Sequence, residues 1–195
     1  NLAIDEKRVV SSTGALAMTT LPKKLVVIGA GYIGLELGTV WARLGAEVEV
    51  IEFLPRILPG MDEEGAKKFM AIAKRQGLKF RLKTAVKSAK ASKTGVSLVV
   101  EPAGGGDEEQ IDADVVLVSV GRHPAIDGLG LEEVGVAVSD RSRIKVDPRF
   151  ETSVEGIFAI GDVIDGPMLA HKAEEDGIAA VELMAGLAGH VDYDA

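Results

Sequence analysis

The chain has 195 residues, and its 22 lysines and arginines against 30 aspartates and glutamates give a formal net charge of −8 at pH 7. This acidic balance argues against nucleic acid or an anionic membrane as a partner. No apolar run approaches the ~18 residues needed to span a bilayer. The sequence contains no cysteine, which excludes a disulfide framework, a thiolate metal site and a cysteine nucleophile within these residues.

The first residues form a lead-in over 1–20, with a short strand around Arg8–Ser11 and a turn at Ser11–Gly14. The chain opens at Asn1 rather than at a methionine and in the middle of a pattern, so we expect it to be a fragment of a longer protein. It opens on no signal-peptide pattern.

Three glycines in the pattern Gly29-x-Gly31-x-x-Gly34 follow an apolar run over Leu25–Ile28, which predicts a buried parallel strand. Helical spacing continues over Leu35–Leu44. Gly29 permits a tight turn, Gly31 lets backbone approach a pyrophosphate, and Gly34 lets the helix pack on the sheet. The helix N-terminus offers free N–H groups and partial positive charge to phosphates.

Glu52 ends the next predicted strand, where a carboxylate can accept hydrogen bonds from the 2′- and 3′-hydroxyls of a ribose. Glycine-rich turns also occur as plain structural turns, but here the strand, the helix, the second strand and the terminal acid are all in place. The motif predicts a dinucleotide site, and the acid favours NAD over NADP. Arg56 suggests a 2′-phosphate site instead, but Glu52 would repel that phosphate.

The middle of the chain continues this α/β pattern with an antiparallel meander inserted into it. The expected elements are a helix over 61–76, a parallel strand over 78–82, antiparallel strands over 86–92, over 96–101 and from Ile111, a parallel strand over 114–120, and a loop with a short turn or helix over 127–138.

A boundary near Asp147-Pro148 precedes a second unit that is too small to build its own core. Two strands are expected over 144–147 and 157–161. An amphipathic helix over 168–187 would carry Ala173, Ile178, Val181 and Leu183 on its apolar stripe.

A second motif lies at the end of the strand over 157–161, where Gly161 allows close approach of backbone and Asp162 places a carboxylate at the strand's edge. The helix that starts near Met168 offers further free N–H groups. Asp162 can instead cap the following turn, and His171 can act as a general base or only through its backbone.

Five segments of the sequence resemble the flavoprotein disulfide reductase family, most closely its dihydrolipoamide dehydrogenases. They are Val10–Leu16, Val26–Glu36, Val118–Arg122, Phe158–Val163 and Gly166–Ala173. The resemblance implies a Rossmann-like dinucleotide-binding domain over 21–147, part of an FAD-binding or central domain over 148–195, and a lead-in from the FAD domain over 1–20.

The resemblance also implies two cofactors, NAD and FAD. Glu52 would hold the adenosine ribose, Val86 would contact the adenine side through its backbone, and Gly121 would pass close to the nicotinamide ribose. Asp162, after Gly161, would bind a ribityl or phosphate-side oxygen of FAD. The residues implied at the NAD pyrophosphate are Gly29, Ala30, Gly31, Tyr32, Ile33, Gly34, Leu35 and Glu36, and those at the pyrimidine edge of the flavin are Met168, Leu169, Ala170 and His171.

Two of these side chains have alternative roles. A tyrosine at the position of Tyr32 covers the nicotinamide pocket in related reductases, whereas the simpler role is packing on the helix surface. Glu36 would lie near the flavin and pair with a lysine from another domain, or be a solvated helix acid. The family's cysteine pair, second glycine motif and histidine–glutamate base pair have no counterpart here, so we expect no catalytic residue, no metal ligand and no activity in this chain alone.

The activity that the resemblance implies for the whole protein is oxidation of dihydrolipoyl groups through a disulfide and FAD, with hydride transfer to NAD. Its partners would be the lipoyl domains of 2-oxo acid dehydrogenase complexes and a second subunit in a homodimer. The location would be the bacterial cytoplasm or the mitochondrial matrix. The alternatives are another flavoprotein disulfide reductase, such as mercuric or glutathione reductase, and a non-catalytic dinucleotide-binding module.

Overall fold

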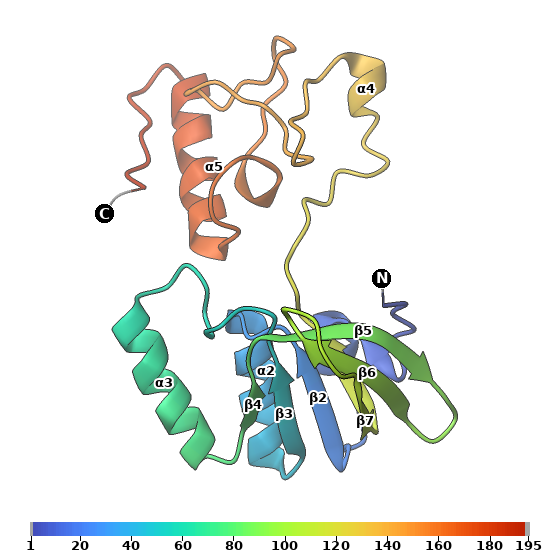
Figure 1. The fold of residues 1–195 in the computed structure, drawn as a ribbon. Helices are drawn as coiled ribbons and strands as arrows, with labels where there is room; N and C mark the ends of the chain where they lie inside the picture. The colour runs from blue at the N-terminus through green and yellow to red at the C-terminus, as the bar shows by residue number, and fades with distance from the viewer. Residues whose placement is uncertain (1, 194–195) are drawn as a thin grey trace. The chain divides into compact units, whose positions relative to one another are not determined.

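The computed structural model describes residues 2–193, and the chain folds as two compact units, Asn1–Gly121 and Arg122–Ala195. The elements of the first unit are β1 (Val9–Val10), α1 (Ser12–Ala17), β2 (Lys24–Ile28), α2 (Tyr32–Leu44), β3 (Glu47–Ile51), α3 (Glu63–Arg75), β4 (Lys79–Arg81), β5 (Thr84–Ala91), β6 (Val96–Pro102), β7 (Glu109–Ala113) and β8 (Val115–Val118). Those of the second unit are α4 (Leu131–Val134), the 3-10 helix η1 (Gly161–Val163) and α5 (Ala170–Met184) (Figure 1).

A five-stranded parallel sheet with the strand order β1-β8-β2-β3-β4 forms the centre of the first unit. Alternate residues of a strand point to opposite faces of the sheet. In β2, Val27 therefore packs in one core with Trp41 of α2, while Val26 packs in a second core with Leu98 of β6. Covering on both faces explains why Leu25–Ile28 of β2 is continuously apolar.

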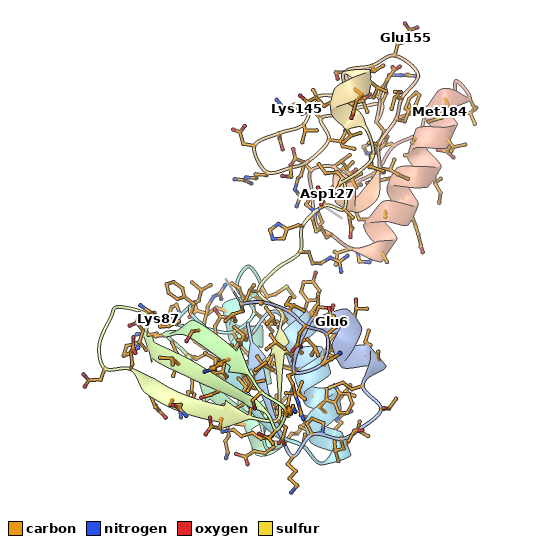
Figure 2. All side chains as sticks on the ribbon, turned by 90° about the vertical axis from the view of Figure 1, so that its right-hand side faces the viewer. Glu6, Lys87, Asp127, Lys145, Glu155 and Met184 are labelled. Carbon is orange, nitrogen blue, oxygen red and sulfur yellow. The ribbon has the colours of Figure 1, made fainter. Side chains whose placement is uncertain are left out.

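The second sheet is antiparallel, with the strand order β5-β6-β7. Every second residue of β6 is buried, which gives the sheet one face toward the core and one toward solvent. On β5, Lys87 is labelled in Figure 2. It pairs with Glu101 at 3.0 Å between Nζ and Oε1. The predicted α/β fold, a parallel sheet with an antiparallel meander, is confirmed.

The turn predicted at Ser11–Gly14 is wrong, because these residues begin a helix. The side chain of Ser11 accepts a hydrogen bond from the N–H of Thr13 at 3.1 Å and so caps α1. A serine at this position starts either a turn or a helix, and tertiary packing of Ala15 against the sheet favours the helix.

The two strands predicted over 144–147 and 157–161 are also wrong. The described residues there form isolated bridges only, namely Val138 with Ile144, Val146 with Thr152, and Glu151 with Phe158. The carboxylate of Asp147 accepts hydrogen bonds from the N–H groups of Arg149 and Glu151, and the chain turns back before a ladder can extend.

The division between the two units comes well before the boundary expected at Asp147-Pro148. Val136 and Ile144, which the sequence places in the dinucleotide domain, pack in one core with Phe150 and Ala180 of the second unit. The turn at Asp147 therefore lies inside this unit.

Helix α5 begins at Ala170 rather than at Met168, and its buried stripe differs from the predicted one. Ile178 and Val181 are exposed, whereas Ala179, Ala180 and two charged residues, Lys172 and Asp176, are buried. The two opposite charges satisfy each other, which allows a polar pair to face the core. Among the described residues, no helix is long and apolar enough to cross a membrane.

Candidate functional site

The glycine loop after β2 is closed toward the sheet at two positions. Gly29 has φ of +103°, and a Cβ there would lie 2.5 Å from the carbonyl oxygen of Ser119. A Cβ at Gly34 would lie 2.2 Å from the carbonyl oxygen of Gly29. Only glycine fits both positions, so the helix packs directly on the turn.

The same loop is open at Gly31, where no described atom lies within 4 Å of an ideal Cβ. Gly31 is also the N-cap of α2, and no described side chain caps this helix. The first-turn N–H groups of α2 are therefore free, and they carry the partial positive charge of the helix end. An open backbone cradle beside free N–H groups fits a pyrophosphate.

Glu52 stands at the carboxyl end of β3, next to the end of β2, and is 8% exposed. Its Oε2 accepts a hydrogen bond from the N–H of Ala30 at 2.7 Å, and its Oε1 accepts one from the N–H of Leu54 at 2.8 Å. A carboxylate offers about four acceptor positions. The acid is thus held against the glycine loop and keeps capacity for two hydroxyl donors.

The side chains within the motif divide by burial. Leu35 is buried in the core under α2 and Ile33 is half-buried, so these two residues anchor the helix. Tyr32 is 48% exposed at the first position of α2, and Glu36 is exposed one turn later. Both side chains are accessible to a ligand, and the roles predicted for Tyr32 and Glu36 stay predictions.

Ser119 joins the site, although the sequence analysis missed it. Its Oγ lies 3.0 Å from the carbonyl oxygen of Ile28 and 3.2 Å from that of Gly29. Its own carbonyl closes the turn at Gly29. The only signal in the sequence is a small polar residue just after β8, and its meaning depends on β8 lying beside β2 in the sheet.

Val86 and Gly121 both belong to the first unit. Val86 lies within β5, opposite Val100 and beside an irregularity in the ladder between Val86 and Ser88. Gly121 has φ of +145°, and no described atom lies within 4 Å of its ideal Cβ. Their contacts with a nucleotide stay predictions.

In the second unit, Asp162 lies in η1 directly after Gly161, which has φ of +72°. Its Oδ2 accepts a hydrogen bond from Nη2 of Arg122 at 2.9 Å, and its side chain is 35% exposed. No backbone N–H of the described residues donates to it, which disfavours the alternative that Asp162 caps the following turn.

The segment Met168–His171 leads into α5. Leu169 has extended backbone and is the N-cap, and no side chain in the described part of the chain caps the helix. Met168 is half-buried, whereas Leu169, Ala170 and His171 are exposed. The segment therefore offers free first-turn N–H groups at a solvent-facing edge, as the sequence predicts.

A buried ion pair on α5 was not predicted from the sequence. Nζ of Lys172 lies 2.7 Å from Oδ2 of Asp176, and the two side chains are 4% and 0% exposed. The pair also bonds both polar groups of Gly161: Asp176 accepts from its N–H at 2.9 Å, and Lys172 donates to its carbonyl at 3.1 Å. The hydroxyl of Tyr193 donates to Oδ1 of Asp176 at 2.7 Å.

This network sets the protonation of its members. Burial acts to raise the pKa of Asp176, but hydrogen bonds from Lys172, Tyr193 and Gly161 outweigh it, so that its pKa lies below the ordinary range. Burial, together with the bond to Asp176, raises the pKa of Tyr193 to about 12. Within residues 2–193, no group of three or more histidines, aspartates or glutamates is arranged to hold a metal ion.

Comparison with known proteins gives a consistent result. Residues 1–177 match the family model described as pyridine nucleotide-disulphide oxidoreductase. The chain is 60% identical to leghemoglobin reductase of Vigna unguiculata over 99% of its length, and 59% identical to the mitochondrial dihydrolipoyl dehydrogenase of Pisum sativum over 99%. It spans 37% and 38% of the length of these two relatives.

A solved structure agrees with the sequence matches. LpdA of Mycobacterium tuberculosis superposes with a TM-score of 0.86 at 25% identity, over 97% of this chain and 40% of that one. The resemblance to dihydrolipoamide dehydrogenases indicated by the sequence motifs is therefore confirmed.

Proposed function

The chain belongs to the pyridine nucleotide-disulphide oxidoreductase family, and from that premise we propose that it is the NAD-binding region of a dihydrolipoyl dehydrogenase, with part of its flavin-binding region. The observation that carries this proposal is the glycine loop. Its open glycine, Gly31, is the N-cap of α2, and the preceding residue, Ala30, donates to the buried carboxylate of Glu52.

The first unit fits NAD in its described residues. The backbone at Gly29–Gly34 would hold the pyrophosphate, because an open cradle and a helix N-terminus both favour negative charge. Glu52 would accept from the two ribose hydroxyls and would repel a 2′-phosphate. Tyr32, exposed at the start of α2, would cover the nicotinamide position. Val86 would lie near the adenine, and Gly121 would lie near the nicotinamide ribose.

The second unit fits the flavin half of FAD. Asp162 is half-buried and held by Arg122, so that its remaining acceptor positions suit a ribityl hydroxyl. The N-terminus of α5 at Met168–His171 would stabilise negative charge on the pyrimidine edge of the flavin. When bound, FAD takes electrons from a dithiol and NAD accepts hydride, and the chain supplies binding, orientation and electrostatics.

For the whole protein, we propose oxidation of dihydrolipoyl groups, with the lipoyl domains of 2-oxo acid dehydrogenase complexes as partners and a homodimer as the assembly. The 59% identity to a mitochondrial dihydrolipoyl dehydrogenase supports this activity and a mitochondrial location. The alternative is a related reductase of another specificity. The 60% identity to a leghemoglobin reductase of Vigna unguiculata supports this alternative.

Chemical-shift mapping tests the NAD site directly. Titration of NAD into the chain should shift the amide signals of Gly29–Glu36 and of Glu52 and its neighbours, in a saturable manner. ADP-ribose should shift the same set, because it shares the pyrophosphate and both riboses. Shifts confined to other regions would refute the proposed site.

A further inference from the structure

The Lys172–Asp176 pair holds a single glycine from both sides. The N–H of Gly161 belongs to the peptide before this residue, and its carbonyl belongs to the peptide after it. Asp176 accepts from the first and Lys172 donates to the second. Both flanking peptides are thereby fixed, and with them the φ and ψ angles of Gly161.

The conformation held in this way is one that few residues adopt. Gly161 has φ of +72°, and a Cβ there would approach the Cβ of Ala173 to 3.0 Å. In the absence of tethers, glycine moves readily among several conformations. Because Asp162 is the next residue, the direction of its carboxylate depends on the backbone of Gly161.

Packing alone does not account for a charged pair at this place. Two charges removed from water pay a desolvation cost, and apolar residues of similar volume often replace a buried ion pair without loss of stability. The charges here make three hydrogen bonds with each other and with Gly161, and Tyr193 adds a fourth. The specific effect of the two charges is to hold the two peptide groups that flank Gly161.

We propose that Lys172 and Asp176 are positioning residues for Asp162, aiming its carboxylate at a ribityl hydroxyl of the flavin. This inference rests on the proposed flavin-binding function of the second unit. Arg122 donates to the carboxylate of Asp162 at 2.9 Å, and the ion pair fixes the backbone of the preceding residue, Gly161. Lys172 and Asp176 do not themselves contact the flavin in this account.

The test uses the 195-residue chain with two probes, FMN and lumiflavin, which share the isoalloxazine ring. FMN carries a ribityl 5′-phosphate chain, whereas lumiflavin has only a methyl group in its place. Binding is followed by flavin fluorescence and by amide shifts at Asp162 and Met168–His171. The key variant is Lys172→Met with Asp176→Leu, which removes both charges and keeps the volume apolar. The matched control is Glu63→Gln with Lys67→Met, the exposed pair of the same spacing on α3.

The wild-type chain and the control should bind FMN more tightly than lumiflavin. Asp162→Ala and the Lys172→Met/Asp176→Leu variant should both lose this preference, with FMN affinity lower by about ten- to a hundredfold, the loss of one hydrogen bond to a charged group. Affinity for lumiflavin should stay close to wild type, which a purely structural role would not predict.

Two other outcomes are distinguishable. If Asp162→Ala loses the preference and the Lys172→Met/Asp176→Leu variant keeps it, the positioning role is refuted and the flavin site stands. If the wild-type chain shifts no amide of the second unit with either probe, the proposed flavin site fails, and the positioning role fails with it.

Discussion

The carboxylate of Glu52 is bonded to the amide of Ala30, with 2.7 Å between Oε2 and the nitrogen. The two residues follow the ends of neighbouring parallel strands, β3 and β2, and both are buried. Glu52, which would bind the ribose hydroxyls, is therefore fixed to the glycine loop, which would hold the pyrophosphate. Binding of the two halves of ADP-ribose should be coupled through this hydrogen bond.

Alanine substitution at two glycines should separate affinity from stability. Gly31→Ala adds a methyl group to open space where a phosphate would lie, so NADH affinity should fall by about tenfold or more, ~1.4 kcal/mol, with an unchanged melting temperature. Gly34→Ala forces a Cβ against the carbonyl of Gly29 and should lower the free energy of unfolding by about 1–3 kcal/mol. Calorimetry and thermal unfolding measure the two effects. Unchanged NADH affinity of Gly31→Ala would show that the pyrophosphate does not lie at Gly31.

Removal of the Tyr32 ring should change binding of the nicotinamide half more than binding of the adenosine half. If Tyr32 covers the nicotinamide position, Tyr32→Ala should strengthen NADH binding by roughly threefold, since no closed state has to open first. ADP-ribose, which has no nicotinamide, should be unaffected. Parallel shifts for the two ligands would show that Tyr32 only packs on the helix.

The ionisation of Tyr193 should report the buried network on α5. The chain has two tyrosines, so Tyr32→Phe leaves Tyr193 as the only one, and its tyrosinate absorbance should appear with a midpoint near 12. Asp176→Asn should lower this midpoint toward the ordinary value of about 10. The pKa is raised by folding, so this group's contribution to stability is complete below pH ~10 and is lost as the pH rises toward 12.

Asp176 has the opposite pH dependence. Its pKa is lowered by folding, so its contribution to stability is present above the unfolded value of about 4 and is lost as the pH falls below it. Acid unfolding of wild type and Asp176→Asn should converge at low pH. A constant difference between their unfolding free energies across this range would contradict the assignment.

The chain alone should show no lipoamide-dependent activity and should not retain FAD through purification. It has no cysteine to form the redox disulfide, and the flavin contacts proposed for its described residues comprise only Asp162 and the start of α5. Loss of the remaining contacts on such a large ligand lowers affinity by several powers of ten. The visible spectrum of the purified chain measures this, and a stoichiometric flavin band would contradict it. Weak FMN binding at high concentration is compatible with this expectation.

Local patterns predicted the glycine loop and the acid beside it because these parts are close together in sequence, while their binding of NAD stays a prediction. The run Leu25–Ile28, the three glycines and Glu52 each carry a signal within one strand–helix–strand unit. Ser119 offers only the signal of a small polar residue just after β8, and its role depends on the packing of β8 beside β2. Lys172 and Asp176 have the spacing of an ordinary surface ion pair, and only their place on the stripe of Ala179 and Ala180 marks them as buried.

The strands expected near 144–147 failed for a related reason. Apolar alternation there is genuine, and Val136, Ile144 and Phe150 are buried. The side chain of Asp147 nevertheless satisfies nearby N–H groups, so the segment turns where a ladder would need to continue. Competition between a local turn and a long-range ladder is not visible in hydrophobic periodicity.

Cofactor discrimination at Glu52 is the sharpest test of the proposed NAD site. Isothermal titration of NADH and NADPH into the wild-type chain, Glu52→Ala and the control Glu47→Ala, an exposed acid at the other end of β3, gives six affinities. Wild type and Glu47→Ala should prefer NADH. Glu52→Ala should lose about 1.5–3 kcal/mol for NADH, or about ten- to a hundredfold, and most of the preference. Equal affinities of the wild-type chain for the two cofactors would contradict the assignment of Glu52 and with it the proposed NAD site.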